Sequence, residues 1–294
     1  MKCIVTGAAG FIGSHLVDRL VKDGHEVCAI DNFSTGSKKN LQDSKNKIKI
    51  KNIDITNIKK LKKLSFFKKV NWVFHLAGLA DIVPSIEKPT EYFDNNVKGT
   101  LNILEVSKNK KLKKFIYSAS ASCYGLPKRF PTNEQSPIDT RYPYALSKFL
   151  GEQLVMHWAK VYKMPNLSLR FFNVYGPRSR TTGAYGAMFG VFLSQMKNNY
   201  PLTIVGSGKQ TRDFIYVSDV IEGLIKAAKS KQTNNIYNLG SGKETSVNYI
   251  ANLISKKKTK IPTRPGEPSR SKADIGKFKR DFNWSSWFYW KSLS

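Results

Sequence analysis

Short apolar runs alternate with amphipathic stretches along the first half of the chain. We predict a β-strand at each apolar run, namely residues 2–6, 26–30, 48–53, 71–77, 114–119 and 167–172. Apolar residues at steps of three and four predict helices between these strands, near residues 11–22, 57–64, 92–109 and 144–162. This alternation is typical of an α/β fold, a doubly wound parallel sheet covered by helices on both faces.

The rhythm changes after Pro177. The sequence becomes irregular and rich in Gly, Tyr, Arg and Pro, returns to a helix at 218–229 and a strand at 235–239, and then loosens again. This change predicts a larger domain and a smaller, partly discontinuous C-terminal lobe. The domain would take residues 1–175 and 212–240, and the lobe residues 176–211 and 241–294.

One predicted helix carries a single apolar stripe. Its members recur at steps of three or four and are Leu146, Leu150, Leu154, Trp158 and Val161. The stripe predicts either core packing or a contact between subunits.

The composition is that of a globular protein with an unusual charge. With 294 residues and 40% hydrophobic content, the chain can bury a sizeable core. The net charge of +28 raises nucleic acid or an anionic membrane as partners. The lysines, however, are spread from Lys38 to Lys291 without an aromatic-interleaved recognition motif. We therefore expect a solvated surface with a general attraction for phosphate-bearing ligands, and no nucleic-acid partner.

Compartment and metal content can also be predicted. No apolar run approaches the roughly 20 residues of a membrane span, and the N-terminus has no signal-peptide organisation, so we expect a cytoplasmic protein. Cys3, Cys28 and Cys123 form no CxxC pair and leave an odd count, which argues against a disulfide framework. The four histidines lack metal-ligand spacing, and we expect no metal.

A glycine-rich turn, GAAGFIG at residues 7–13, joins the first strand to the first helix. Glycine permits the tight turn and lets backbone amides approach a pyrophosphate, while the helix N-terminus supplies partial positive charge. The second strand ends at Asp31, at about the interval expected for a carboxylate that binds ribose hydroxyls. The sequence therefore predicts a dinucleotide site.

Acidic residues bear on which dinucleotide fits. Asp31 would repel a 2′-phosphate and no arginine lies beside it, which favours NAD, although Lys38 and Lys39 keep NADP open. Asp54 and Ile55 end the third strand, where they can meet the adenine; for Asp54 the alternative is a simple turn aspartate.

Tyr144 and Lys148 lie four residues apart, on one face of a predicted helix. A phenol has a pKa of about 10, and a positive charge within several Å lowers that pKa. Ser120, at the end of the fifth strand, can hydrogen-bond a substrate oxygen and share its proton with Tyr144. A Tyr-x-x-x-Lys pair alone is also found on solvated helix surfaces, but beside a nucleotide turn it predicts a base for sugar hydroxyls.

These motifs together resemble the extended short-chain dehydrogenase/reductase family, in its branch of nucleotide-sugar epimerases. The resemblance covers nearly the whole chain. Besides the glycine turn, the serine-rich strand end and YALSK at 144–148, it is carried by residues 31–36, 75–78, 170–178, 210–219 and 264–267. It implies a Rossmann fold with a smaller substrate-binding lobe, NAD as cofactor and a UDP-sugar as substrate.

The resemblance also implies residue roles. Tyr144 matches the base that removes the sugar 4-hydroxyl proton, Lys148 the lysine that binds the nicotinamide ribose and depresses the tyrosine pKa, and Ser120 the group that hydrogen-bonds the 4-oxygen. The implied cofactor-binding positions are these two, Tyr144 and Lys148, with Gly7, Gly10, Phe11, Ile12, Gly13, Asp31, Asn32, Asp54, Ile55, Leu76 and Ala77.

A substrate site follows from the same resemblance. Arginine forks suit phosphate oxygens, and a surface salt bridge is the alternative for any one arginine. The implied substrate-binding positions are Asn173, Arg212, Arg264 and Arg270 for the nucleotide diphosphate, and Asn95 and Ser122 for the wall of the site.

The serine-rich strand end separates neighbouring activities. Sugar 4,6-dehydratases of this family need an acidic pair directly after the catalytic hydroxyl residue, and decarboxylating members keep a glutamate there, whereas this chain has Ala121 and Ser122. Without that acid, a 4-keto intermediate has no evident route forward, but it can rotate and take its hydride back on the other face. We therefore predict a UDP-hexose 4-epimerase that supplies surface polysaccharide or galactose metabolism, with a dehydratase or 4-keto reductase as the alternative.

Two positions bear on the sugar. Ser271 matches a position that is bulky where only the plain hexose is accepted and small where an N-acetyl group must fit; an ordinary loop serine is the alternative. Ala80 replaces a lysine often present in galactose-type epimerases, which weakens the case for the plain hexose.

The sequence also bears on a non-catalytic function, on the oligomeric state and on the C-terminus. A regulator that only senses NAD would not need Ser120, Tyr144 and Lys148 together. The resemblance implies a homodimer through helices 92–109 and 144–162. In residues 282–294, aromatic residues replace the closing amphipathic helix usual in the family, so we expect them to lie on an interface or to cover the substrate lobe, and the lobe to be weakened.

Overall fold

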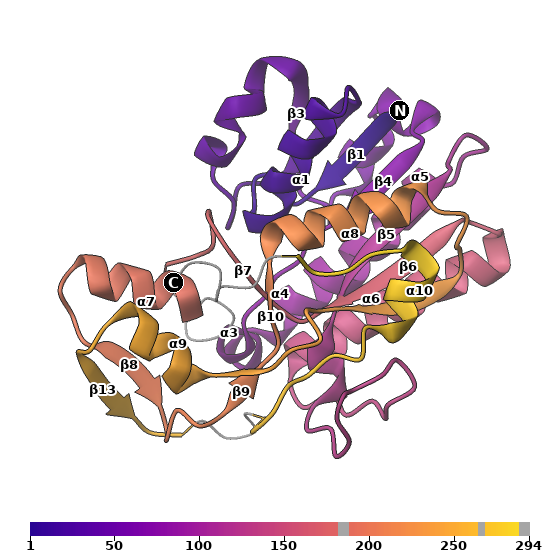
Figure 1. Cartoon of the computed structure of the whole chain (residues 1–294). Coiled ribbons are helices and arrows are strands. Elements are labelled where there is room, and N and C mark those ends of the chain that lie inside the picture. The colour runs from indigo at the N-terminus through magenta and orange to yellow at the C-terminus, as the bar shows by residue number, and fades with distance from the viewer. Residues whose placement is uncertain (182–187, 264–267, 288–294) are drawn as a thin grey trace.

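A seven-stranded parallel sheet forms the centre of the protein in a computed structural model that describes residues 1–181, 188–263 and 268–287. The strand order is β11-β6-β5-β4-β1-β2-β3 (Figure 1). The strands are β1 (Lys2–Thr6), β2 (Glu26–Asp31), β3 (Ile48–Asn52), β4 (Trp72–His75), β5 (Lys114–Ser120), β6 (Asn166–Phe171) and β11 (Asn235–Leu239). All seven predicted strands, and the parallel α/β sheet, are confirmed.

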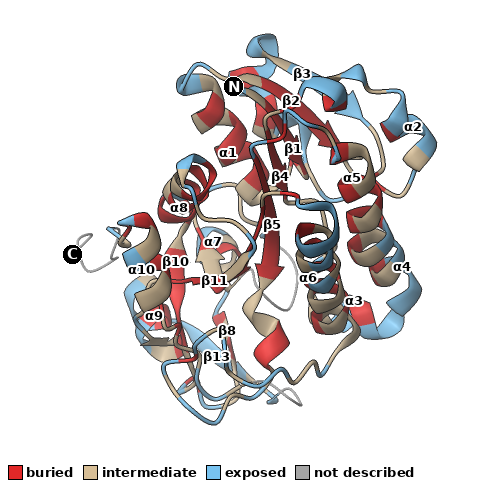
Figure 2. Cartoon of the chain, turned by 90° about the vertical axis from the view of Figure 1, so that its right-hand side faces the viewer, coloured by how far each residue is buried: buried red, intermediate tan, exposed pale blue. Residues whose placement is uncertain are grey.

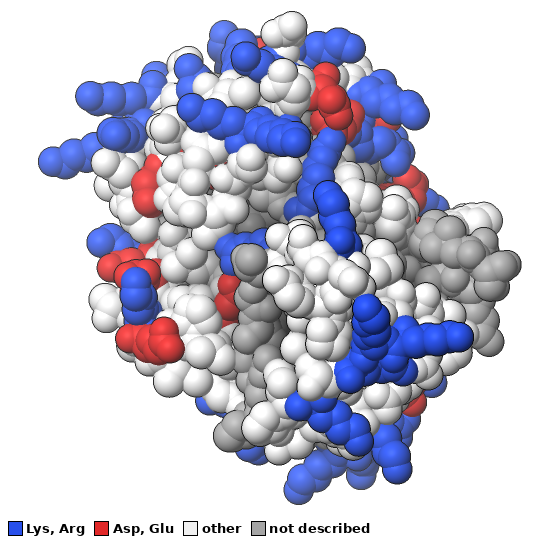
Figure 3. Space-filling model, turned by 90° about the vertical axis from the view of Figure 1, so that its left-hand side faces the viewer, with Lys and Arg blue, Asp and Glu red and all other residues white. Residues whose placement is uncertain are grey.

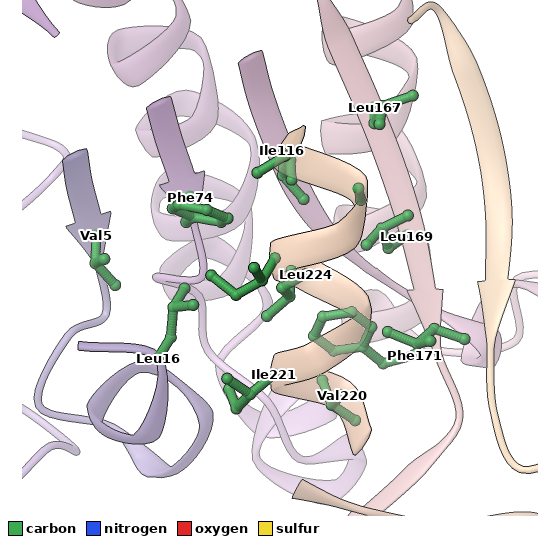
Figure 4. Close-up of a cluster of buried hydrophobic side chains, with 14 of the residues drawn as sticks. Val5, Leu16, Phe74, Ile116, Leu167, Leu169, Phe171, Val220, Ile221 and Leu224 are labelled. Carbon is green, nitrogen blue, oxygen red and sulfur yellow. The ribbon is translucent and has the colours of Figure 1, made fainter. Parts of the chain in front are cut away.

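Helices cover both faces of this sheet, as predicted. The helices of this domain are α1 (Phe11–Lys22), α2 (Ile58–Lys62), α3 (Ile82–Glu87), α4 (Pro89–Phe93), α5 (Gly99–Ser107), α6 (Pro143–Tyr162) and α8 (Val217–Lys229). In Figure 2 the buried strands lie between α1 and α8 on one side and α5 and α6 on the other. Leu16 of α1 and Leu224 of α8 pack over Phe74 and Ile116 of the sheet (Figure 4).

Local sequence explains where these helices begin and end. Pro143 stands in the first turn of α6, where its missing N–H costs nothing, and the helix stops at Lys163 in the left-handed conformation. The predicted helix 92–109 is a longer, composite element, because α4 and α5 are joined by a π-helical turn at Asp94–Lys98. Short 3₁₀ helices complete the domain at Lys38–Lys47, Ser65–Lys69 and Ala121–Tyr124.

The region predicted to form the smaller lobe contains regular secondary structure. It contains α7 (Met188–Lys197), β8 (Leu202–Val205), α9 (Val247–Ile254) and β13 (Lys258–Ile261), with β8 and β13 paired in parallel. Two further short pairs lie nearby, β7 (Asn173–Tyr175) with β10 (Phe214–Tyr216) and β9 (Thr211–Arg212) with β12 (Thr245–Ser246). Phe192, Ile204 and Ile250 belong to a separate apolar cluster of this lobe. These helices and strands were not predicted from the sequence, because they are too short to show a clear period.

The end of the chain packs differently from the prediction. α10 (Gly276–Phe282) buries Phe278 and Phe282 against β11 and α8. Trp284 is buried beside Phe278, and its indole N–H donates to the backbone oxygen of Asp219, 3.2 Å away. This part of the terminus therefore covers the larger domain and not the substrate lobe. Residues 288–294, also part of the prediction, lie outside the described residues, and the division into two lobes stays a prediction.

The apolar stripe of α6 is divided between the core and the surface. Leu146, Leu150, Leu154 and Trp158 are only partly buried, and Val161 is exposed. The helix instead buries its small and polar side, which includes Ala145, Gly151, Glu152, Val155 and Ala159. Core packing is therefore confirmed for Leu154 and Trp158, which pack against a core cluster, and not for Leu146, Leu150 and Val161. The subunit contact remains a prediction.

Two general properties follow from the described residues. Among them, no helix is both long and apolar enough to cross a membrane, and no group of His, Cys, Asp and Glu side chains is arranged to hold a metal ion. Cys3, Cys28 and Cys123 are free and buried.

Candidate active site

A cleft of about 940 Å³ opens at the carboxyl ends of the parallel strands and continues between the sheet and the smaller lobe. Most of the predicted site residues line it. They are Gly7, Gly10, Phe11, Ile12, Gly13, Asp31, Asn32, Ile55, Leu76, Ala77, Asn95, Ser120, Ser122, Tyr144, Lys148, Asn173, Arg212, Arg270 and Ser271. Asp54 is not part of this lining, and Arg264 lies outside the described residues.

The glycine turn leaves no room for side chains. Gly7 has a φ of +67°, and a Cβ atom on it would lie 2.7 Å from the backbone nitrogen of Ala77. A Cβ atom on Gly13 would lie 2.0 Å from the carbonyl oxygen of Gly7. No side chain caps the N-terminus of α1 at Gly10, so its amides remain available to an anion. This cradle fits the pyrophosphate of a dinucleotide.

Asp31 stands at the end of β2 beside this cradle. Its carboxylate accepts hydrogen bonds from the backbone N–H of Ala9 at 2.9 Å and of Phe33 at 2.7 Å. These two hydrogen bonds fix the orientation of both carboxylate oxygens at the wall of the cleft. Lys38 lies 5.5 Å from the ring centroid of Phe33 and is not part of the lining. The position of Asp31 favours ribose hydroxyls over a 2′-phosphate.

The adenine end differs partly from the prediction. Asp54 accepts a hydrogen bond from the side chain of Asn32 at 2.8 Å and two from Thr56. Asp54 therefore holds the side chain of Asn32, which lines the cleft, and stabilises the turn at residues 54–56. Ile55 is buried and contributes apolar surface to the cleft.

The hydroxyls predicted to be catalytic lie together at the end of β5. The 3₁₀ turn after Ser120 lets the Oγ and backbone N–H of Ser122 donate to Ser120 Oγ, at 2.8 and 3.2 Å. Tyr144 reaches the same place from the first turn of α6. Burial raises the pKa of Tyr144, while hydrogen bonds with Ser120 and Ser122 act in the opposite direction. The structure thus joins two hydroxyls to the phenol that the sequence predicts as base.

Lys148 lies one turn further along α6 and is buried. Its Nζ is 4.4 Å from the ring centroid of Tyr117, and burial lowers its pKa to about 7, partly opposed by the charge of Glu152. The predicted lowering of the Tyr144 pKa is wrong for the chain by itself, because burial disfavours the phenolate more than its hydrogen bonds favour it.

A buried ion pair supports this strand end from below. Arg170 of β6 donates to Glu152 of α6 at 2.6 and 3.0 Å, and its other nitrogen donates to the hydroxyl of Tyr124 at 2.8 Å. Tyr124 closes the 3₁₀ turn that begins at Ala121. The pair therefore connects α6, β6 and the serine turn.

The substrate end lies toward the smaller lobe. The guanidinium of Arg212 is positioned by the backbone oxygens of Thr211 and Pro268, at 2.8 and 2.7 Å. Arg270 forms a two-bonded ion pair with Glu244, at 2.6 and 3.1 Å, while it also lines the cleft. The salt bridge considered as the alternative for Arg270 therefore exists.

Three residues of the cleft region, Asn96, Asp81 and Arg180, were not predicted from the sequence. The side chain of Asn96 is buried and exchanges hydrogen bonds of 2.8 and 3.0 Å with the backbone of Leu79, which shapes the wall after β4. Across the cleft, Arg180 forms an ion pair of 2.5 Å with Asp81. Asn96 is next to the predicted Asn95, so the sequence motif around Asn95 could have indicated it. The Arg180–Asp81 ion pair joins segments that are distant in the sequence, so no local motif could have indicated it.

Comparison with known proteins agrees with this site. Residues 3–240 match the NAD dependent epimerase/dehydratase family. The chain is 32% identical over 293 residues to the UDP-glucose 4-epimerase of Mycolicibacterium smegmatis, which covers 97% of this chain and 93% of the relative. It is 36% identical over 261 residues to the UDP-N-acetyl-alpha-D-glucosaminuronate decarboxylase of Bacillus cytotoxicus, with coverage of 86% and 79%.

Solved structures lead to the same family. The UDP-glucose 4-epimerase of Thermotoga maritima, solved with UDP-glucose, has a TM-score of 0.92 and 32% identity, and the match covers 98% of this chain and 94% of that one. With the glycine cradle, Asp31 and the Ser120–Tyr144–Lys148 arrangement in place, the chain belongs to the NAD dependent epimerase/dehydratase family, and its cofactor is NAD.

Proposed function

We propose that the protein is a 4-epimerase that interconverts two UDP-hexoses, with NAD as a cofactor that is regenerated in each catalytic cycle. The observation that carries this proposal is the composition of the β5 end, where Ser120 and Tyr144 meet without an adjacent acid. The relatives named above act on UDP-sugars but differ in reaction, so these residues, and not similarity alone, decide between the reactions.

In the proposed mechanism, the side chains that meet at the β5 end transfer one proton to and from the sugar. Tyr144 Oη takes the proton of the sugar 4-hydroxyl and later returns it, and Ser120 Oγ hydrogen-bonds the 4-oxygen throughout. NAD, when bound, supplies the hydride acceptor and donor. Protonated Lys148 holds a ribose hydroxyl, and its charge favours the phenolate form of Tyr144. Inversion requires the 4-keto sugar to rotate in the cleft so that the hydride returns to its other face, after which the same phenol gives its proton back to the 4-oxygen.

The carboxylates of the cleft do not supply the acid that a dehydratase needs. Among the described lining residues only Asp31 and Asp81 carry a carboxylate. Asp31 is held by the backbone at the glycine turn, and Asp81 is paired with Arg180. The dehydratase alternative therefore lacks an identified acid at the β5 end, whereas a 4-keto reductase could use Tyr144 as its proton donor and is separated from an epimerase by the assay.

An activity assay tests the proposal. We expect the purified protein to interconvert UDP-glucose with UDP-galactose, or their N-acetyl forms with each other, without net consumption of NAD. Interconversion in neither pair would refute it. Net oxidation of NADH, or formation of a stable keto sugar, would instead support the alternative.

For the sugar, we propose that the cleft accepts an N-acetyl group beside Ser271. Ser271 lines the cleft and is small enough to leave room there. Ser271→Tyr is expected to lower kcat/KM for UDP-N-acetylglucosamine by about tenfold or more, since a clash of this kind costs at least about 1.4 kcal/mol. Ser271→Ala, as the matched control, should retain turnover. Unchanged N-acetyl activity in the tyrosine variant would contradict this assignment.

We also propose a homodimer that forms through the surface stripe of α6 and the neighbouring segment 92–109. A shallow groove there is lined by Val97, Leu150, Leu154 and Met156, among others. Leu154→Glu is expected to convert a dimer to a monomer in sedimentation velocity, because a buried unpaired charge is costly. Ile50→Glu, at the exposed edge strand β3, should stay dimeric. A wild-type monomer at micromolar concentration would contradict the proposal.

The cellular setting is part of the same proposal. Buried, free cysteines suit the reducing cytoplasm, where nucleotide sugars for polysaccharide or galactose metabolism would be the substrates.

A further inference from the structure

Exposed apolar side chains gather on the outer side of the smaller lobe. Leu193 and Met196 lie on α7 and Tyr200 just beyond it, while Tyr249 and Leu253 lie on α9. Their exposed fractions range from 40% for Tyr249 to 65% for Tyr200. The spacing of three or four residues places them on one side of each helix. We call these five residues the α7/α9 surface.

The two helices lie next to each other. α7 and α9 contact one another, and both pack on β8, at the lower left of Figure 1. Their inner residues Phe192 and Val247 are buried and line the cleft. The α7/α9 surface therefore faces away from the proposed active site, which stays free when this surface is covered.

The segments that carry the α7/α9 surface contain basic residues and no acidic ones. Residues 188–210 and 247–263 contain no Asp or Glu, but six lysines, all exposed, namely Lys197, Lys209, Lys256, Lys257, Lys258 and Lys260. Lys257 Nζ donates to the side chain of Asn199 at 2.7 Å, next to Tyr200, and β13 places the following lysines alongside β8. Figure 3, which views this side of the molecule, shows Lys and Arg side chains around uncharged surface.

We propose that the α7/α9 surface docks the protein on an anionic phospholipid bilayer. Exposed Leu, Met and Tyr side chains can enter the headgroup region, where tyrosine is well suited to a boundary between water and hydrocarbon. Lysines beside them meet lipid phosphates at the same depth. A second copy of the chain does not fit this surface, because two clusters of six lysines would face each other. The proposal does not depend on the reaction that the cleft catalyses.

Vesicle co-sedimentation of the full chain tests this proposal. Wild-type protein is mixed with phosphatidylcholine vesicles, or with vesicles half composed of phosphatidylglycerol, at low and high salt. Three double variants accompany it. Leu193→Asp/Leu253→Asp removes apolar contacts, Lys256→Glu/Lys260→Glu reverses charge at the surface, and Lys68→Glu/Lys69→Glu makes the same charge change on the larger domain as the matched control. Circular dichroism and thermal unfolding check that each variant is folded.

We expect wild-type protein to bind the anionic vesicles and not the neutral ones. Both variants of the α7/α9 surface should lose about tenfold or more in partition coefficient, and the control about twofold or less. Absence of binding by wild type, an equal loss in the control, or full binding by the apolar variant would overturn the proposal. RNA binding through the same lysines with no vesicle binding would overturn it as well, in favour of a nucleic-acid partner.

Discussion

Replacing Tyr144 with phenylalanine is expected to reduce kcat by about 10²–10⁴-fold, the range typical of losing a positioned general base. The substitution removes only the oxygen that exchanges a proton with the sugar 4-hydroxyl. It also removes the hydrogen bonds that tie the phenol to Ser120 and Ser122, although Ser122 still donates to Ser120. The measurement is single-turnover and steady-state epimerisation, with NAD binding followed separately.

The matched control lies on the same helix. Tyr162 ends α6, is half exposed, and has no place in the cleft. Tyr162→Phe should leave kcat within about twofold of wild type, as a surface change of this size usually does. A Tyr144→Phe variant with full activity, folded and able to bind NAD, would show that another group acts as the base.

Removing Glu152 is expected to destabilise the protein by about 3–5 kcal/mol, the cost of leaving a buried charge without its partner. The Glu152 and Arg170 side chains are 0% and 3% exposed. The carboxylate accepts from Arg170 and also from Ser168 Oγ at 2.9 Å, so Glu152→Ala strands a guanidinium and a hydroxyl together. Urea unfolding followed by circular dichroism measures the loss.

A surface carboxylate provides the comparison. Glu26 pairs with Lys49 at 2.7 Å, but both side chains are well exposed. Glu26→Ala should therefore cost about 0–1 kcal/mol. If the two variants lost equal stability, the Glu152–Arg170 pair would not be the support of the β5 end that its burial suggests.

The sheet and its helices were predictable because the pattern of apolar residues in each element begins and ends with that element. Strand β1 is a buried apolar run bounded by the glycine turn, and α1 begins where that turn ends, so the predicted 2–6 and 11–22 agree with the structure. Tyr144 and Lys148 were predictable for a similar reason, since a local helical spacing fixes their common face.

Other features depend on contacts between distant segments. The strands β8 and β13 have four residues each and pair across more than fifty positions, which leaves no local signal. The hydrogen bonds that Asp54 accepts from Asn32 and Thr56 could not be predicted either, and its contact with the adenine stays a prediction. The surroundings of Tyr144 and Lys148, which set the direction of their pKa shifts, are formed where α6 contacts β5 and β6, strands that are distant from both residues in the sequence.

The most direct test of the account follows the hydrogen at C4 of the sugar. UDP-glucose, or its N-acetyl form, carrying deuterium at C4 is incubated with the enzyme and NAD in ordinary water, and the product is analysed by NMR and mass spectrometry. The account predicts the 4-epimer with deuterium retained at C4 and no accumulation of NADH. A product that has exchanged its deuterium with solvent, or a keto sugar formed with lasting reduction of NAD, would contradict it.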